Sequence, residues 1–196
     1  MAGNLDLETL RGLIDSGEID TIVVCFADMQ GRLLDKRITG RYFLDHAVHK
    51  RHVCDYLLTV DMEMKPVPGF KAASWDTGYG DFAVRPDMTT LRRIPWLEAT
   101  ALVLGDCVDS TGKALAHSPR GILARQIERA RARGLEVKIG SELEFYIFDD
   151  SFEAASEMGY RDPRSAGSYV EDYHIFQTTK EEGLIRAIRN GMEGAA

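Results

Sequence analysis

Two glutamates separated by a single residue are the feature of the sequence that most strongly suggests chemistry. Glu142 and Glu144 lie in the stretch KIGSELEFYIFD, residues 138–149, which is otherwise largely apolar or aromatic. Side chains alternate between the faces of a strand, so both carboxylates would share one face, about 7 Å apart. Like charges at that spacing repel, and a buried charge is unfavourable unless it is paired or binds a metal. If this strand is buried, the pair must face a cation.

The residues alone leave three interpretations of this pair open. The first is a solvent-facing strand surface, although Gly140, Tyr146 and Phe148 on the same face are not typical of one. The second is the acid pair of a glycosidase, but those carboxylates normally come from separate segments across a cleft, about 5–10 Å apart. The third is a site for Mg²⁺ or Mn²⁺, which take oxygen ligands. Two glutamates cannot complete such a site, and residues 149–196 offer no obvious further cluster.

Other chemical signals are weaker. His46, His49 and His52 recur every three residues on a predicted helix and its end, a spacing that permits a metal site but brings no obvious cysteine or carboxylate pair with it. Dinucleotide-binding, phosphate-loop and G-x-S-x-G motifs do not occur. A metal-dependent phosphatase or hydrolase would need Asp/His clusters that the sequence lacks.

Composition excludes several classes of protein. The 196 residues suit one medium domain or two small ones, and the net charge of -7 argues against a nucleic-acid partner. No apolar run approaches the length of a membrane span, and the N-terminal stretch MAGNLDLETLRGL lacks the basic region and apolar core of a signal peptide. Cys25, Cys54 and Cys107 are odd in number and lie in apolar stretches, which favours reduced, buried thiols. We therefore expect a cytoplasmic protein with no nucleic-acid or membrane partner.

The first half of the chain predicts a small α+β unit over residues 18–108, preceded by a leading helix within residues 1–17. Asp6 can cap that helix and Gly17 can end it. Gly31 can take the positive φ of a hairpin turn between two β-rich runs. The remaining elements are a short helix at 40–50, a loop at 65–80, and strands at 20–28, 32–38, 53–62, 81–87 and 100–108.

The second half, residues 112–196, opens on a strong helix start. Ser118 is followed by a proline at the first helical turn, and Gly134 can end the helix. The expected inner stripe comprises Ile122, Leu123, Ile127 and Ala130, with the arginines of this helix on a solvated face. The glutamate strand, a turn-rich region over 149–172 and a closing helix follow. One strand with two flanking helices cannot bury both faces of a sheet, so this second domain looks unfinished.

Several of these segments, taken in order, resemble the glutamine synthetase family. The stretch KIGSELEFYIFDD resembles the family's G-x-E-x-E-F signature strand, and FADMQGRLLDKRI resembles its N-terminal hairpin. GYGDFAVRPDMTTLRRIPW resembles its D-x-x-x-x-P-D-x-x-T segment, and GLIRAIRNGMEGA resembles the helix after the signature strand. The resemblance covers nearly the whole chain and is closest to the branch that contains γ-glutamyl-polyamine and related amine synthetases.

This resemblance implies an α+β fold. A β-grasp N-terminal domain would occupy residues 18–108. Residues 112–196 would form only the first part of the catalytic domain, an α/β half-barrel that is truncated here. In the family, the N-terminal domain of a neighbouring subunit closes each half-barrel, so the resemblance also implies a ring-like homo-oligomer.

The implied reaction is ATP-dependent ligation of the γ-carboxylate of glutamate to ammonia or an organic amine, through γ-glutamyl phosphate. Two Mg²⁺ or Mn²⁺ ions serve the intact enzyme. By residue match, Glu142 would bind the metal near the ATP phosphates, and Glu144 the metal near the glutamate substrate. Such enzymes belong to glutamine biosynthesis and nitrogen metabolism.

The sequence departs from the family at two places. Ammonia-using enzymes carry a D-G-S-S segment whose Asp helps to bind ammonium. The nearest stretch here is VDMEMKPVPGF, in which Asp61 matches the catalytic Asp but Gly-Ser-Ser does not follow. That departure favours an organic amine. The family's later E-x-x-x-x-G-Q-x-E and G-x-G-x-H segments, which supply further metal ligands, are not in these residues. A truncated, non-catalytic structural homologue is therefore the alternative to a ligase.

Overall fold

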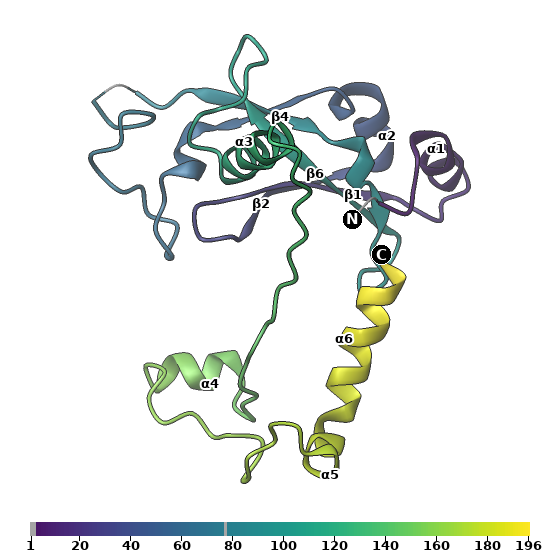
Figure 1. Ribbon diagram of the computed structural model, residues 1–196, viewed down its shortest axis with the longest axis vertical. Coiled ribbons are helices and arrows are strands. Elements are labelled where there is room, and N and C mark those ends of the chain that lie inside the picture. Colours follow the sequence, from purple (N-terminus) through teal and green to yellow (C-terminus); the bar gives the residue numbers. More distant parts are fainter. Residues whose placement is uncertain (1–2, 77) are drawn as a thin grey trace. The chain divides into compact units, whose positions relative to one another are not determined.

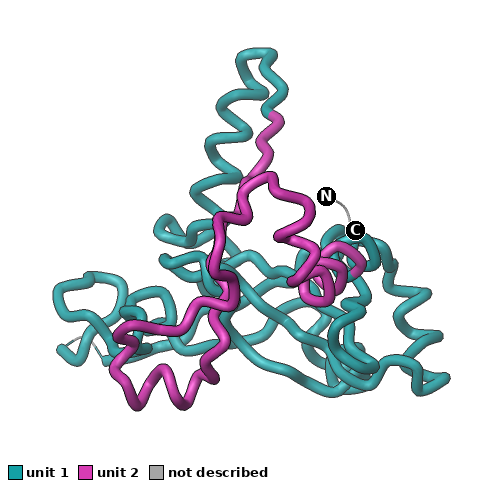
Figure 2. Tube along the Cα trace, turned by 90° about the horizontal axis from the view of Figure 1, so that it is seen from below, with its two compact units in different colours: residues 1–137, 191–196 teal, residues 138–190 magenta. Residues whose placement is uncertain are grey.

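A computed structural model describes residues 3–76 and 78–196 (Figure 1). The chain divides into two compact units, which Figure 2 colours separately. The first unit contains residues 1–137 together with 191–196, and the second contains residues 138–190. This division falls later than the boundary expected near the stretch DSTGKALAHSPR, residues 109–120, and the domains 18–108 and 112–196 stay predictions.

The first helix, α1 (Leu7–Asp15), forms as its capping residues predict. The carboxylate of Asp6 accepts a hydrogen bond from the Thr9 N–H at 2.7 Å. Leu10 and Ile14 on one side of the helix are buried in the core. Gly17 follows the helix with φ +79°, a value that favours glycine.

A mixed sheet of six strands forms the centre of the described part of the first unit (Figure 1). Its order is β2-β1-β6-β4-β3, with β5 also paired to β6. Strand β1 runs antiparallel to β2 and parallel to β6, the central strand of this order. The strands are β1 (Thr21–Ala27), β2 (Leu33–Thr39), β3 (Arg51–Cys54), β4 (Asp81–Pro86), β5 (Arg92–Arg93) and β6 (Thr100–Val108). The mixed α/β character is thus confirmed, and the β-grasp arrangement stays a prediction.

A buried ion pair joins the two outermost strands of this order. The Nε of Arg51 on β3 lies 3.1 Å from each carboxylate oxygen of Asp35 on β2. The side chains are only 11% and 1% exposed, respectively. Since β2 and β3 stand at opposite ends of the strand order, the sheet curls far enough for its two edges to meet.

The hydrophobic core fills the inside of this curled sheet. Phe26 on β1 and Phe82 on β4 meet edge to face, with ring centroids 5.4 Å apart. A fully buried side chain of this size contributes about 1.5–3 kcal/mol. The core also includes Leu10, Ile19, Ile22, Val24, Phe43, Leu58, Val84, Leu91, Ala101 and Val103.

Burial of two cysteines confirms part of the expectation for the thiols. All three cysteines are free, Cys25 and Cys107 are buried, and Cys54 is half-buried. Burial raises the pKa of the Cys25 thiol to about 12 and that of Cys107 to about 11. Both thiols are therefore protonated and unreactive at neutral pH.

Two predicted elements of the first unit are shorter than expected. The helix expected at 40–50 is a single turn, α2 (Gly40–Tyr42), followed by the π-helical turn η1 (Phe43–Ala47). The strand expected at 53–62 ends at Cys54, after which η2 (Asp55–Leu58) is a 3₁₀ turn. An apolar run of this length is compatible with either a strand or a buried turn, so periodicity alone could not decide.

The helix α3 (Pro119–Arg131) forms where predicted, but none of its residues is fully buried. Ser118 caps it, and Gly134 follows with φ +73°. The expected inner stripe is wrong for Ile122 and Leu123, which are 40% and 54% exposed, whereas Ile127 and Ala130 are half-buried. The opposite side, with Gly121, Ala124 and Arg125, lines a cavity of about 620 Å³ shared with Arg85 and Asp106 of the sheet.

The second unit lacks the strand expected around the two glutamates. Residues 138–147 are extended without strand pairing, and only an isolated bridge from Phe148 to Ser165 follows (Figure 1). A strand requires a ladder of hydrogen bonds to a neighbouring strand, and the segment forms no such ladder with the described residues, although the Ile147 carbonyl accepts a hydrogen bond from the Ala166 N–H at 3.0 Å. The helical elements of this part are α4 (Phe152–Glu157), α5 (Ile175–Thr178), η4 (Thr179–Glu181) and α6 (Glu182–Gly194), whose last residues belong to the first unit.

No helix in the described part of the chain combines the length and the apolar character that crossing a bilayer requires.

The buried Asp35 carboxyl should give folding stability a distinct pH dependence. Burial raises its pKa to about 6, and the Arg51 and Lys36 charges offset only part of this rise. The unfolded value is about 3.9. Between about pH 4 and pH 6 the folded state thus holds more protons than the unfolded state, so stability falls as pH rises. We expect Asp35→Asn to remove this fall.

Urea unfolding at pH 4, 5, 6 and 7 measures the effect, with the exposed Asp15→Asn as matched control. Loss of the Arg51 pairing adds an offset that does not depend on pH in this range. Parallel stability curves for Asp35→Asn and the parent protein would show that Asp35 does not titrate as stated.

The two units should differ sharply in hydrogen exchange. Every described residue of 138–190 is at least partly exposed, whereas the core lies in the first unit. Amides of β1 and β6 should therefore exchange about a thousandfold more slowly than amides of residues 139–147. Equal protection in these two regions of the 196-residue chain would contradict the described packing.

Candidate functional site

The two predicted metal ligands lie in the extended segment 138–147, which has no strand assignment. Glu142 and Glu144 are both exposed, and Leu143 between them is 85% exposed. The carboxylate oxygens of Glu142 and Glu144 are ligands that suit a hard divalent cation. Two carboxylates are too few for a complete site, and no group of three or more His, Cys, Asp or Glu side chains that could hold a metal occurs among the described residues. The structure therefore leaves the metal assignment as a prediction.

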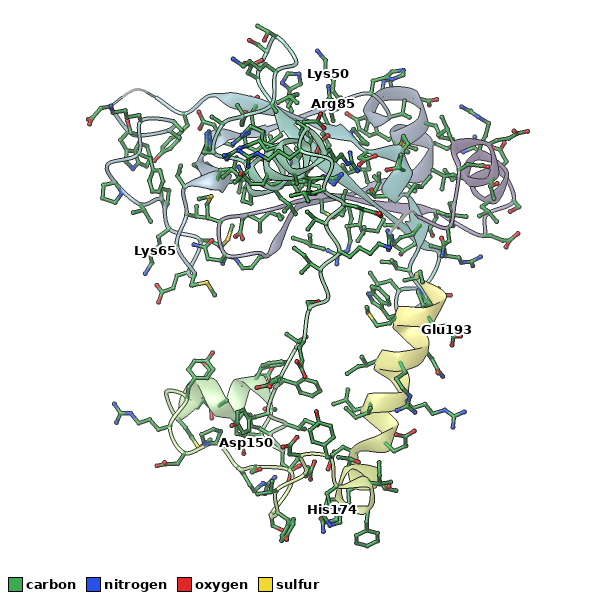
Figure 3. All side chains as sticks on the ribbon, in the orientation of Figure 1. Lys50, Lys65, Arg85, Asp150, His174 and Glu193 are labelled. Atoms are coloured by element: carbon green, nitrogen blue, oxygen red, sulfur yellow. The ribbon has the colours of Figure 1, made fainter. Side chains whose placement is uncertain are left out.

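The third predicted site residue, Asp61, lies in a different part of the chain and organises its own turn. Its Oδ1 accepts hydrogen bonds from the N–H groups of Glu63 and Lys65, both at 2.9 Å. Its own N–H donates to the Lys65 carbonyl at 3.0 Å. Lys65, labelled in Figure 3, marks this turn. The carboxylate is half-buried and held in one orientation by these bonds.

A clamp that the sequence did not predict fixes this turn to the β1–β2 hairpin. Asp28 is 1% exposed, and its Oδ2 accepts a hydrogen bond from the Nε of Arg32 at 2.7 Å. The two terminal nitrogens of Arg32 donate to the carbonyls of Met62 and Asp61, at 2.9 and 3.0 Å. We call Asp28, Arg32 and these two carbonyls the hairpin clamp. The clamp uses the Nε and both terminal nitrogens of Arg32, a planar set of donors that only arginine offers.

The hairpin turn itself is built to present this arginine. Gly31 has φ +83°, as the sequence predicts for its position. The Oδ1 of Asp28 accepts from the N–H groups of Gln30 and Arg32, at 2.9 and 2.8 Å. Gln30 adds a hydrogen bond from its side-chain amide to the Val60 carbonyl at 3.1 Å. The signal in the sequence is an Asp four residues before an Arg around a glycine, but nothing local reveals the distant carbonyls.

A second charged network ties α3 to the sheet. Arg120 bonds to the carboxylates of Asp87 and Asp106, the latter at 3.0 Å from its Nε. Arg85, labelled beside α3 in Figure 3, lies 3.7 Å from Asp106. Burial raises the pKa of Asp87. Hydrogen bonds from Thr89 and the charge of Arg120 together lower it by more, so the pKa of Asp87 lies below its usual range. Arg120 is therefore not the solvated residue that the sequence predicted.

Comparisons with known proteins bear on what these elements belong to. Residues 116–195 match the family described as "Glutamine synthetase, catalytic domain". The chain is 46% identical over 192 residues to gamma-glutamylethanolamide synthetase GlnA4 of Streptomyces coelicolor, covering 97% of this chain and 42% of the relative. The chain belongs to the glutamine synthetase family. This confirms the resemblance seen in the sequence.

Two further comparisons are informative. Glutamate–isopropylamine ligase of a Pseudomonas species is 30% identical over 187 residues, covering 95% of this chain and 41% of the relative. A crystal structure of a novel glutamine synthase homologue matches with a TM-score of 0.51 at 16% identity, over 72% of this chain and 35% of that one, which supports the fold. The chain spans about two-fifths of the length of the curated relatives it matches.

Removing the hairpin clamp should loosen the turn that carries Asp61. Arg32→Ala deletes the donors to the Met62 and Asp61 carbonyls. We expect the amides of Glu63 and Lys65 to exchange about tenfold faster, since each lost hydrogen bond to a charged group contributes about 1.5–3 kcal/mol. Hydrogen exchange followed residue by residue measures this change. The matched control is Arg37→Ala, an exposed arginine on β2, and unchanged exchange at Glu63 and Lys65 in Arg32→Ala would refute the clamp.

Proposed function

We propose that the chain forms part of an ATP-dependent ligase that joins the γ-carboxylate of glutamate to an amine. The observation that carries this proposal is the 46% identity, over 97% of the chain, to a relative named for making γ-glutamylethanolamide. The second relative is named for ligating glutamate to isopropylamine. Because the chain spans about two-fifths of these relatives, the activity is proposed for the whole protein in which these residues act.

The proposed reaction has two steps. A γ-carboxylate oxygen of glutamate attacks the γ-phosphorus of ATP, which forms γ-glutamyl phosphate and releases ADP. The amine nitrogen then attacks the γ-carbonyl carbon, phosphate leaves, and the nitrogen loses a proton. ATP thus converts a poor leaving group, oxide, into phosphate.

Mg²⁺ or Mn²⁺ is the implied cofactor, and Glu142 and Glu144 would supply two of its oxygen ligands. By the family match, Glu142 would serve the ion near the ATP phosphates and Glu144 the ion near glutamate. Such ions neutralise charge on a transferring phosphoryl group and orient the reactants. Two carboxylates do not complete a site, so further ligands are needed beside them.

The acceptor is proposed to be an organic amine, with Asp61 near it. The residues after Asp61 are Met-Glu-Met and not Gly-Ser-Ser, and both relatives are named for organic amines. The hairpin clamp would keep the Asp61 turn in place while substrates exchange. Ammonia remains the competing acceptor that a rate comparison must include.

The assembly proposed for the whole protein follows the family. Residues 18–108 would be the β-grasp domain and residues 112–196 the start of the half-barrel. A ring-like homo-oligomer in the cytoplasm would bring the two together between neighbouring subunits. A truncated, non-catalytic homologue is the second candidate, and the observation in its favour is the incomplete ligand set among the described residues.

Replacing one proposed ligand tests the function directly. Glu144→Gln, made in the intact protein as the cell produces it, keeps the size of the side chain and removes its charge. We expect γ-glutamyl transfer to fall by more than the roughly 10–100-fold that loss of an outer-shell partner causes. The Mn²⁺ concentration for half-maximal rate should also rise. ADP release and product formation, measured across a Mn²⁺ series, report both effects.

The matched control for this substitution is Glu157→Gln, an exposed glutamate on α4. It should leave both the rate and the metal requirement unchanged. Full activity of Glu144→Gln at limiting Mn²⁺ would eliminate Glu144 as a ligand. No turnover by the parent protein with any amine would favour the non-catalytic homologue.

A further inference from the structure

Asp55 carries a buried carboxylate oxygen without a partner. It begins η2, directly after β3, and its N–H donates to the Gly80 carbonyl at 3.0 Å. Its Oδ2 accepts a hydrogen bond from the Gly80 N–H, also at 3.0 Å. Its Oδ1 is shielded from solvent and has no hydrogen-bond partner among the described residues. An unsatisfied buried acceptor is unfavourable and needs an explanation, such as a bound donor.

Three aromatic rings belong to the residues that flank Asp55 and its partner Gly80 in the chain. Tyr56 follows Asp55 in the chain, and Tyr79 precedes the glycine that Asp55 holds. The rings of Tyr56 and Tyr79 meet edge to face at 5.8 Å, and those of Tyr79 and Trp75 at 5.0 Å. Trp75 is 83% exposed, so this row of rings runs from the half-buried Tyr56 out to solvent.

The surrounding segment favours a cation electrostatically. Residues 55–81 contain five carboxylates and two ammonium groups, which gives 2 − 5 = −3. A negative local field raises the concentration of cations near the surface. Aromatic faces attract organic cations in addition, and most strongly the face of tryptophan. A metal ion would not use the rings, whereas an alkylammonium group would use both the rings and the carboxylate.

We propose that Asp55, Tyr56, Tyr79 and Trp75 form a subsite for the ammonium group of an organic amine. The Oδ1 of Asp55 would accept a hydrogen bond from the ammonium, and the rings would contact its alkyl substituent. The subsite rests on the proposed function in one respect, since it would hold the acceptor amine in its protonated, waiting form. It involves residues other than Asp61 and the glutamate pair.

Tryptophan fluorescence can detect such binding in the 196-residue chain without ATP or glutamate. The chain has two tryptophans, so Trp96→Phe leaves Trp75 as the only indole reporter. The probe is isopropylammonium chloride, and the matched neutral probe is 2-propanol at the same concentrations and ionic strength. We expect saturable quenching by the ammonium and none by the alcohol.

Two substitutions locate the binding. Asp55→Asn keeps a carbonyl to accept from Gly80 but loses the charge, and it should weaken binding about tenfold or more, because a hydrogen bond between charged groups contributes 1.5 kcal/mol or more. Asp15→Asn, an exposed acid on α1 outside residues 55–81, is its matched control and should leave the affinity unchanged. Trp75→Ala, followed by calorimetry, should also weaken binding without affecting folding, because the side chain is almost fully exposed.

The outcomes separate this subsite from the ligase itself. Equal quenching by 2-propanol, or an unchanged affinity in both Asp55→Asn and Trp75→Ala, would overturn the subsite even if the intact protein ligates amines. Ammonium-specific binding that both variants weaken would support the subsite even if no ligase activity were found. The binding measurement contains neither ATP nor glutamate, so failure of the proposed function cannot mimic failure of the subsite.

Discussion

The ion pair between Asp35 and Arg51 is the contact on which the architecture of the first unit depends. It joins β2 to β3, the two ends of the strand order, and so converts an open sheet into a curled one around a single core. The chain leaves β1 through the hairpin turn just before β2, and it enters the Asp61 turn soon after β3. Meeting of these edges therefore places Arg32 where it can reach the Met62 and Asp61 carbonyls.

This pair is also an unusual one. The backbone of Asp35 has φ +123°, a value that residues other than glycine rarely adopt. Burial opposes its ionisation even with Arg51 beside it. A buried pair of this kind is weak support for stability by itself, because desolvation offsets much of the attraction. Its contribution lies in fixing which edges meet, and the hydrophobic core supplies the favourable energy.

Local signals in the sequence predicted much of this fold. Asp6, Gly31 and Ser118 act in the structure as their types and neighbours indicate, because caps and turns are satisfied by atoms a few residues away. Arg120 and Ile122 were placed on the wrong sides of α3, since the carboxylates that draw Arg120 inward lie on other strands. Contacts between residues this far apart in the sequence depend on the topology of the fold, and helical periodicity carries no information about topology.

The candidate site shows the same limit more strongly. Order of motifs identified the glutamine synthetase family, and the glutamate pair stood out by its spacing alone. The expected strand around Glu142 and Glu144 did not form, because a strand requires neighbours and the described residues offer none there. The hairpin clamp and the unpartnered Oδ1 of Asp55 could be found only in three dimensions. The clamp joins Arg32 to the Asp61 carbonyl, and Asp55 is bonded through its Oδ2 to Gly80, so both depend on residues that are distant in the sequence.

The fate of one oxygen atom tests the central claim most directly. Glutamate labelled with ¹⁸O in its γ-carboxylate is supplied with ATP and isopropylamine to the intact protein, and the released phosphate is analysed by mass spectrometry. Attack of the carboxylate on the γ-phosphorus predicts one ¹⁸O in each phosphate released, together with the γ-glutamyl amide. Phosphate without label, or label in AMP, would contradict a γ-glutamyl phosphate intermediate and with it the assignment as a ligase of this type.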